Sequence, residues 1–227
     1  LVCVVKTELA LAKRTSQNAS IILLEEPENH LSHTRLNQLI KCISEQYAEK
    51  QILISTHSSF VANKLGLGKV MLLDNLRITR FSELPEDTYN FFKKVAGYDT
   101  LRMILCKKTI LCEGDSDELV IQKAYMQLND GRLPIEDGIE VISVGVSFLR
   151  FLEIADCIQT KIAVVTDNDG DMAAINKKYA NYIGAKRKEY IKICVDDVVD
   201  TGTLKIGKSD YNYNTLEPKL LKVNGLD

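Results

Sequence analysis

Short apolar runs alternate with amphipathic stretches along most of the chain, and this alternation predicts an α/β fold with mostly parallel strands. Residues 21–24 and 51–55 are apolar enough to be buried strands. Between them, residues 33–49 carry Leu36, Leu39, Ile40 and Ile43 at helical spacing, which predicts an amphipathic helix. Residues 1–13 also have a helix-like pattern.

A second alternation of strands and helices begins near residue 109. It predicts strands at 109–112, 140–144, 161–166 and about 190–195, and helices at 116–128, 148–158, after Asp169 and from 216 to 222, with a polar segment up to residue 214. Consecutive β-α-β units need right-handed crossovers and a parallel sheet, whose ligand sites lie at the carboxyl ends of the strands.

The segment 76–107 separates the two alternations, because it is polar, contains Pro85 and lacks a clear strand period. We therefore expect a first domain over residues 1–80, a linker over 81–107 and a second domain over 108–227.

Composition narrows the class of protein. The 227 residues are 45% hydrophobic and 26% charged, as in folded globular proteins, and the net charge of -2 means that any nucleic-acid surface is local. The apolar runs are far shorter than the roughly 18 residues that span a membrane. Six cysteines without a CxxC pair, and no signal-peptide pattern, favour the cytoplasm. Because the first residue is Leu1, we expect a fragment of a longer protein.

Two carboxylates, Glu25 and Glu26, directly follow the first predicted strand, and His57 follows the second. Nucleotide hydrolysis needs an acid linked to Mg²⁺ and a base that orients the attacking water. A neutral imidazole can hydrogen-bond the γ-phosphate or that water. The simpler alternative is that the glutamates end a strand at the surface and His57 is an ordinary loop residue.

The strings EEPENHL and STHSS together resemble the Walker B motif, D-loop and H-loop of ABC-type ATPases. The resemblance implies that Glu25 is the metal-linked acid, Glu26 the catalytic base, residues 28–31 the D-loop and His57 the switch histidine, with ATP bound in the full-length protein. Glu25 departs from the more usual Asp. Because no GxxxxGK[ST] loop occurs in the chain, we expect it not to hydrolyse ATP on its own.

A second set of acids follows two later strands: Glu113 and Asp117 in CEGDSD, and Asp167 and Asp169 in TDNDGD. Asp167 and Asp169 are expected on the same side of an extended chain. Four convergent carboxylates repel one another unless a cation lies between them, and oxygen ligands favour Mg²⁺ or Mn²⁺, with two ions roughly 4 Å apart in phosphodiester chemistry. Alternatively, the acids mark a helix N-terminus and a surface turn.

The spacing EGxxD followed by DxDG resembles the Toprim domain, a Rossmann-like parallel sheet, over about residues 108–225. The resemblance implies that Glu113 is a metal ligand or general acid/base and that Asp117, Asp167 and Asp169 hold metal. In OLD-family nucleases an acid in a TLE-like motif joins the second metal site, which points to Glu217. That family places a catalytic lysine further on. Only Lys219 and Lys222 follow Glu217, so we expect that the chain is truncated before it.

A basic strip lies between residues 177 and 192 and is interleaved with Tyr179, Tyr182 and Tyr190. Its candidate nucleic-acid contacts are Lys177, Lys178, Lys186, Arg187 and Lys188. Such a strip can neutralise phosphates beside a metal site, but a solvated helix face has the same composition.

The order of an ABC-type half followed by Toprim resembles the OLD family, which includes the Gabija and retron-associated defence nucleases. That resemblance implies a metal-dependent DNA endonuclease regulated by its ATPase domain, acting in anti-phage defence, with DNA, a second copy of the chain and a helicase or other defence protein as partners. Two alternatives remain at this stage. One is a nucleotide-gated DNA-binding or assembly module that does not cut, and the other is a topoisomerase-like strand transferase with a nucleophilic tyrosine.

Overall fold

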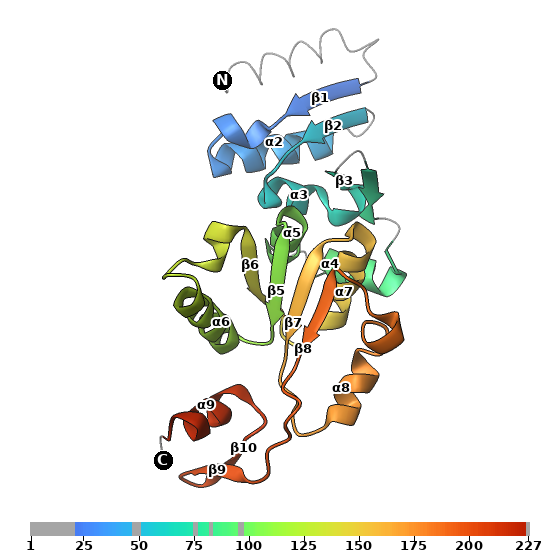
Figure 1. The fold of residues 1–227 in the computed structure, drawn as a ribbon. Helices are drawn as coiled ribbons and strands as arrows, with labels where there is room; N and C mark the ends of the chain where they lie inside the picture. The colour runs from blue at the N-terminus through green and yellow to red at the C-terminus, as the bar shows by residue number, and fades with distance from the viewer. Residues whose placement is uncertain (1–20, 47–50, 75–76, 82–83, 95–97, 226–227) are drawn as a thin grey trace. The chain divides into compact units, whose positions relative to one another are not determined.

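The computed structural model describes residues 21–46, 51–74, 77–81, 84–94 and 98–225 (Figure 1). It divides into two compact units, Leu1–Leu101 and Arg102–Asp227. The helix expected over residues 1–13 lies outside the described residues. The domain limits expected from the sequence stay a prediction.

The first unit is built on two short parallel strands, β1 (Ile21–Glu25) and β2 (Gln51–Ser55), which pair in register from Ile21 and Gln51 onward. The other elements are η1 (Pro27–His30), α2 (His33–Gln46), α3 (Ser59–Leu65), η2 (Leu67–Lys69), the hairpin β3 (Met71–Asp74) and β4 (Arg77–Arg80), and α4 (Glu86–Lys94). The two strands and the helix between them agree with the sequence pattern.

Helix α2 packs its apolar stripe on one face of the β1–β2 pair. Leu39 and Ile43 are buried against Leu24, Ile52 and Ile54. Leu36 and Ile40 are buried with Val61 of α3. The four apolar positions predicted for this helix therefore face the core, as a stripe at 3.6-residue period must if it is to leave water.

The segment expected to be a linker contains two helices, α4 and α5 (Tyr98–Leu105). Leu84, Thr88 and Phe92 are buried at a spacing of four residues, and Phe81 is buried before them. Pro85 stands just before α4, and its carbonyl accepts the Tyr89 amide, so the proline lies at a helix start. Helical period is thus present, but a threonine at one buried position and the charged residues of the first turn conceal it.

The second unit has a four-stranded parallel sheet in the order β6-β5-β7-β8. Its strands are β5 (Lys108–Cys112), β6 (Ile139–Ser143), β7 (Lys161–Val165) and β8 (Ile191–Cys194). Helix α6 (Asp115–Leu128) and η4 (Pro134–Asp137) connect β5 to β6, and α7 (Phe148–Ile158) connects β6 to β7. Helix α8 (Met172–Lys178) and η5 (Gly184–Lys186) connect β7 to β8. Helix α6 packs on β5 and β6, and α7 packs on β7 and β8 (Figure 1). The predicted α/β class and parallel sheet are confirmed.

The chain after β8 is more ordered than its polar sequence suggested. A hairpin of β9 (Thr203–Ile206) and β10 (Ser209–Asn212) precedes α9 (Leu216–Asn224). Seven of the eight hairpin residues are exposed, so the strands lack the apolar alternation by which a half-buried strand is recognised.

Candidate functional site

The strand ends of the first unit bring Glu26 and His57 together. The Glu26 amide donates to the Ser55 carbonyl at 2.9 Å, which joins the ends of β1 and β2. Glu26 has a left-handed backbone, with φ of 39°, and its carboxylate accepts a hydrogen bond from Asn29. His57 Nδ1 lies 3.4 Å from Glu26 Oε1. Glu25 is exposed at the end of β1.

Glu28, which was expected only as part of the D-loop, anchors the loop after β2. Its Oε1 accepts hydrogen bonds from Thr56 Oγ1 at 2.6 Å and from the amides of His57 at 3.0 Å and Ser58 at 3.2 Å. Burial raises the pKa of Glu28, but these hydrogen bonds outweigh it, and the net pKa is lowered. The charged Glu28 thereby fixes His57 beside Glu26, an arrangement in which a carboxylate and an imidazole can orient one water.

Glu28→Ala is expected to lower the free energy of unfolding by about 2 kcal/mol, because two backbone amides and a hydroxyl lose a charged acceptor. Glu28→Gln keeps an acceptor oxygen and is expected to cost less than half of that. Glu45→Ala removes only an exposed pair with Lys41 and is the control, with a change below about 0.5 kcal/mol. Urea unfolding and hydrogen exchange of the His57 and Ser58 amides measure the effect, and an unchanged exchange rate would contradict the anchoring role.

In the second unit, Glu113 and Asp117 are placed by the turn from β5 into α6. The Glu113 carbonyl accepts the Gly145 amide at 3.0 Å and the Ser143 hydroxyl at 3.1 Å, so the end of β5 is tied to the end of β6. Asp117 Oδ2 accepts the Gly114 amide at 2.9 Å. Asp117 therefore caps the helix, as the simpler alternative held, while its charge still acts on Asp167.

Asp167 and Asp169 follow β7, but not as the sequence predicted. Asp169 has a φ of 50° and Gly170 a φ of 83°, so the chain turns left-handed instead of continuing extended. The expectation that the two acids share one side of an extended strand is wrong for this reason. Asp167 is partly buried and accepts the Leu216 amide at 3.1 Å, whereas Asp169 is exposed.

Three of the predicted acids of this unit nevertheless act on a fourth, Asp167. Burial raises the pKa of Asp167 to about 6, although the Leu216 amide lowers it, and the charges of Asp117, Asp169 and Glu113 raise it further. Carboxylates from the ends of β5 and β7 therefore share one negative region. Within the described ranges, no three His, Cys, Asp or Glu side chains are grouped closely enough to hold a metal ion in the present arrangement.

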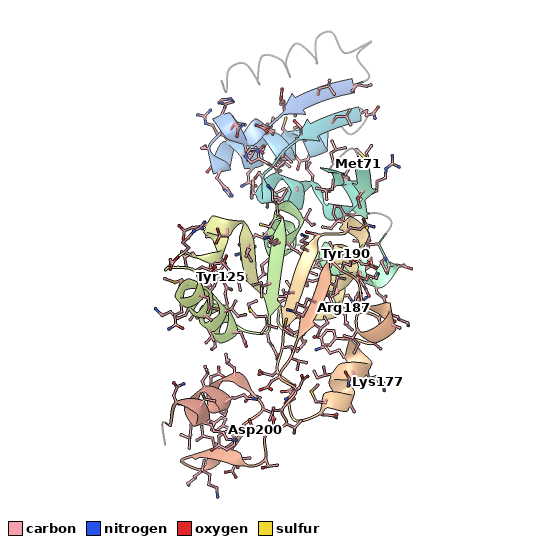
Figure 2. The ribbon with its side chains drawn as sticks, viewed as in Figure 1. Met71, Tyr125, Lys177, Arg187, Tyr190 and Asp200 are labelled. Atoms are coloured by element: carbon pink, nitrogen blue, oxygen red, sulfur yellow. The ribbon has the colours of Figure 1, made fainter. Side chains whose placement is uncertain are left out.

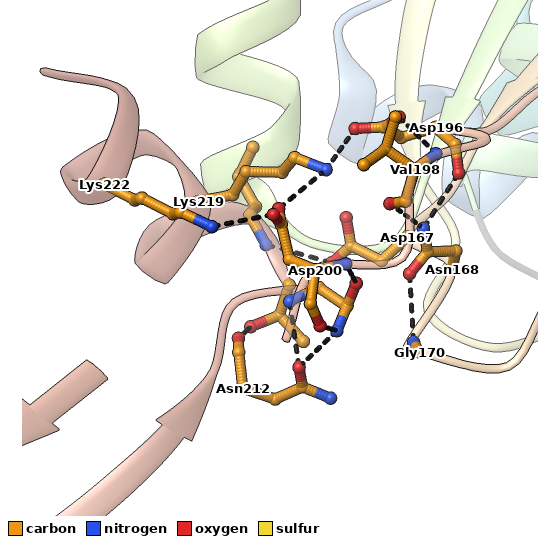
Figure 3. A network of polar contacts seen from close by, with 12 residues as sticks. Asp167, Asn168, Gly170, Asp196, Val198, Asp200, Asn212, Lys219 and Lys222 are labelled. Atoms are coloured by element: carbon orange, nitrogen blue, oxygen red, sulfur yellow. Dashed lines mark hydrogen bonds and ion pairs between the residues drawn. The ribbon is translucent and has the colours of Figure 1, made fainter. Parts of the chain in front are cut away.

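Glu217 lies on the first turn of α9, one residue after the amide that binds Asp167. Its side chain is exposed. The two lysines that follow are engaged with the segment after β8 (Figure 3). Lys219 pairs with Asp196 and lies 3.5 Å from Asp200, and Lys222 pairs with Asp200 at 2.7 Å.

Three asparagines near these acids were missed by the sequence reasoning: Asn168, Asn212 and Asn214. Asn168 and Asn214 are only 2% and 5% exposed. Both form hydrogen bonds with the chain between residues 196 and 200. Figure 3 shows those of Asn168. The sequence signal was the Asn between two Asp in TDNDGD, which is indistinguishable from ordinary turn composition.

The basic strip is only partly available as a surface. Lys188 pairs with Asp156, Lys186 donates to Asn181 at 2.9 Å, and Lys178 lies over the ring of Phe148 at 5.1 Å. Lys177 and Arg187 are exposed on the second unit (Figure 2). These two side chains are the members of the strip best placed to meet a phosphate backbone.

Two of the three interleaved tyrosines are buried, and the third is partly buried. Tyr179 and Tyr182 are 0% and 8% exposed, and Tyr190 donates to Asp156 at 2.6 Å. Burial raises the pKa of each of the three phenols to about 12. Tyr179 and Tyr182 lack the solvent access that attack on a DNA phosphate needs, and the Tyr190 hydroxyl is engaged with Asp156, so none of these three is arranged as the nucleophile of a strand transferase.

Comparison with known families agrees with the two sets of motifs. Residues 104–169 match the family described as "Overcoming lysogenization defect protein-like, TOPRIM domain". Residues 8–63 match an AAA domain family, whose description also names the AbiEii toxin and the type IV TA system. In this order the matches correspond to an OLD-type fusion of an ATPase and a TOPRIM domain, which confirms the resemblance. No curated protein matches the chain. Among the described residues, no helix is long and apolar enough to cross a membrane.

Proposed function

We propose that this chain belongs to a metal-dependent DNA endonuclease. The proposal is supported by the match to an AAA-type ATPase-like domain followed by the match to an OLD-like TOPRIM domain. The first unit regulates the cutting site in response to ATP in the full-length protein. The proposed metal is Mg²⁺ or Mn²⁺, with two ions per site. The proposed role is anti-phage defence in the cytoplasm. The proposed assembly is a homo-oligomer formed through the ATPase part, with a helicase or other defence protein as a further partner.

The observation that carries this proposal is the state of Asp167. Its carboxylate is partly buried at the carboxyl end of a parallel strand, and three neighbouring carboxylates act on it from the β5 and β7 ends. A site of this kind lacks positive charge, and a divalent cation supplies it. The donor set consists of carboxylate oxygens, which suit Mg²⁺ and Mn²⁺ better than Zn²⁺. The donor types present therefore suit the metal that the family implies, and metal binding would have to draw the carboxylates of the described residues closer together than they now lie.

Within that site Asp167, Asp169, Asp117 and Glu217 would hold the metal, and Glu113 is the candidate either to join them as a ligand or to hold or move a proton. Bound metal would activate a water and stabilise the charge on the leaving oxygen of a phosphodiester. Glu113 is exposed directly after β5, and its backbone is hydrogen-bonded to the end of β6. Its carboxylate can therefore reach a substrate from a fixed backbone position. Lys177 and Arg187 would hold the DNA backbone.

Cleavage of supercoiled plasmid tests the proposal. The full-length protein is expected to nick or linearise the plasmid with Mn²⁺ or Mg²⁺ and to lose this activity in EDTA. Glu113→Gln is expected to reduce the rate by more than about 100-fold, the usual scale for a lost general acid or base. Glu189→Gln changes an equally exposed carboxylate before β8 and is expected to cut like the parent.

Two other outcomes would select the alternatives. DNA binding without cutting by the parent and both variants would favour a DNA-binding or assembly module. A covalent bond between DNA and the protein would favour a strand transferase. The three tyrosines of the basic strip make the second outcome unexpected for that part of the chain, because Tyr179 and Tyr182 are buried and the Tyr190 hydroxyl is bonded to Asp156.

A further inference from the structure

Asn168 stands between the two acids of the β7 loop and is almost completely buried, at 2% exposure. Its Nδ2 donates to the carbonyls of Asp196 at 2.8 Å and Val198 at 2.9 Å, and its Oδ1 accepts the Gly170 amide at 2.9 Å. One side chain thus joins the loop after β7 to the chain after β8. The amide nitrogen thus donates twice and the amide oxygen accepts once, all within the protein, so the orientation of the side chain is fixed.

Asn214 makes the corresponding connection from the other side. Its Oδ1 accepts the Asp200 amide at 2.7 Å and its Nδ2 donates to the Asp200 carbonyl at 2.9 Å. The side-chain amide therefore bonds both backbone polar groups of one residue. A Cβ placed on Gly170 would lie 3.3 Å from Asn214 Nδ2, which shows how closely the β7 loop approaches it. Asn212 donates to the Asp169 carbonyl at 3.3 Å.

The loop that these asparagines hold is one that needs support. Asp169 has a left-handed backbone, which costs free energy for a residue with a side chain, and it persists where surrounding contacts determine it. Two residues after Asn214, the Leu216 amide binds Asp167 directly. Pairing of Lys219 with Asp196 and of Lys222 with Asp200 attaches α9 to the same segment (Figure 3).

We propose that Asn168 and Asn214 are positioning residues for the metal site, and that through them the segment after β8 sets the affinity of the carboxylates for a divalent cation. The inference rests on the proposed metal-dependent function, since it concerns the same acids. Residues that orient metal ligands typically change metal affinity or activity by about 10- to 100-fold when they are replaced. Neither asparagine touches the substrate in this role.

Binding of Mn²⁺, followed by electron paramagnetic resonance, measures the affinity without reference to cleavage. We expect Asn168→Ala and Asn214→Ala to raise the Kd of Mn²⁺ by about 10-fold or more relative to the parent. The matched control is Asn224→Ala, which removes an exposed asparagine that donates only to the Leu220 carbonyl of its own helix. Its Kd is expected to match that of the parent.

Cleavage then separates positioning from catalysis. At saturating Mn²⁺ the two asparagine variants are expected to recover a rate within about 3-fold of the parent, whereas Glu113→Gln stays inactive. Thermal unfolding in EDTA identifies a variant that has lost its fold, and in that case Asn168→Ser or Asn214→Ser, which keep a small polar group, replace it in the same comparison.

The outcomes distinguish this inference from the proposed function. If the parent binds Mn²⁺ and the folded asparagine variants bind it equally well, the positioning role is wrong while the metal site stands. If the parent binds no Mn²⁺, both fail. Weaker binding in the asparagine variants, an unchanged control and recovery at high Mn²⁺ support the inference.

Discussion

Asp167→Asn is expected to make the metal-free protein more stable at neutral pH and, at the same time, to abolish metal-dependent cleavage. The asparagine keeps an oxygen that accepts the Leu216 amide but removes a charge that burial and three carboxylates oppose. Loss of a metal ligand is expected to reduce cleavage by more than about 100-fold, beyond the usual effect of residues that only orient ligands.

The stability effect has a defined pH dependence. The pKa of Asp167 is raised from 3.8 to about 6 in the folded protein, so the folded state binds this proton more tightly than the unfolded state does. The free energy of unfolding therefore falls as the pH rises from about 4 to about 6, and the advantage of Asp167→Asn grows over the same interval.

One pKa unit corresponds to about 1.4 kcal/mol, and partial exposure of Asp167 reduces the net advantage near pH 8 to about 1 kcal/mol. Below about pH 3 the variant and the parent should unfold alike, because Asp167 is then neutral in both states. Thermal unfolding in EDTA at several pH values measures the difference. A variant that is less stable than the parent near pH 8 would contradict the charge repulsion on which the metal proposal depends.

Arg102→Ala is expected to give the largest loss of stability in the second unit, about 3 kcal/mol. Arg102 of α5 pairs with Glu140 of β6 and donates to the Val141 carbonyl at 3.4 Å. The side chains of Arg102 and Glu140 are only 27% and 12% exposed. Removal of the arginine leaves the Glu140 carboxylate largely out of water without its cation.

Arg132→Ala is the matched control, because Arg132 is 56% exposed and its partner Asp137 also accepts the Tyr125 hydroxyl at 2.6 Å. Its loss is expected to cost less than about 1 kcal/mol. Urea unfolding of the chain, with hydrogen exchange of peptides from β5 and β6, measures both variants. Equal effects would show that the last turn of α5 contributes no more to this unit than an exposed surface pair does.

The sequence predicted the strands next to the acids because each strand is a short apolar run followed by charged residues. The runs that end at Glu25, Glu113 and Asp167 need only local information, namely a buried strand followed by polar residues. The predicted helix between β1 and β2 was recovered for the same reason, since its stripe of apolar residues faces one surface.

The parts that were not predicted depend on contacts distant in the chain or on weak patterns. Asn168 binds carbonyls 28 and 30 residues away, so no local pattern marks it as different from a turn residue. The left-handed backbone at Asp169 reversed an expectation that assumed an extended chain. Helix α4 was hidden because one of its buried positions is the polar Thr88, its first turn is acidic, and Pro85 precedes it.

Binding of Mn²⁺ by the parent, Glu113→Gln and Asp167→Asn tests most directly whether acids from two strand ends form one metal site. We expect the parent to bind Mn²⁺ saturably and both variants to bind it at least about 10-fold more weakly, because each removes a carboxylate from the same negative region. Glu189→Gln is expected to bind like the parent. Equal affinity in the parent and in both strand-end variants would contradict a shared metal site.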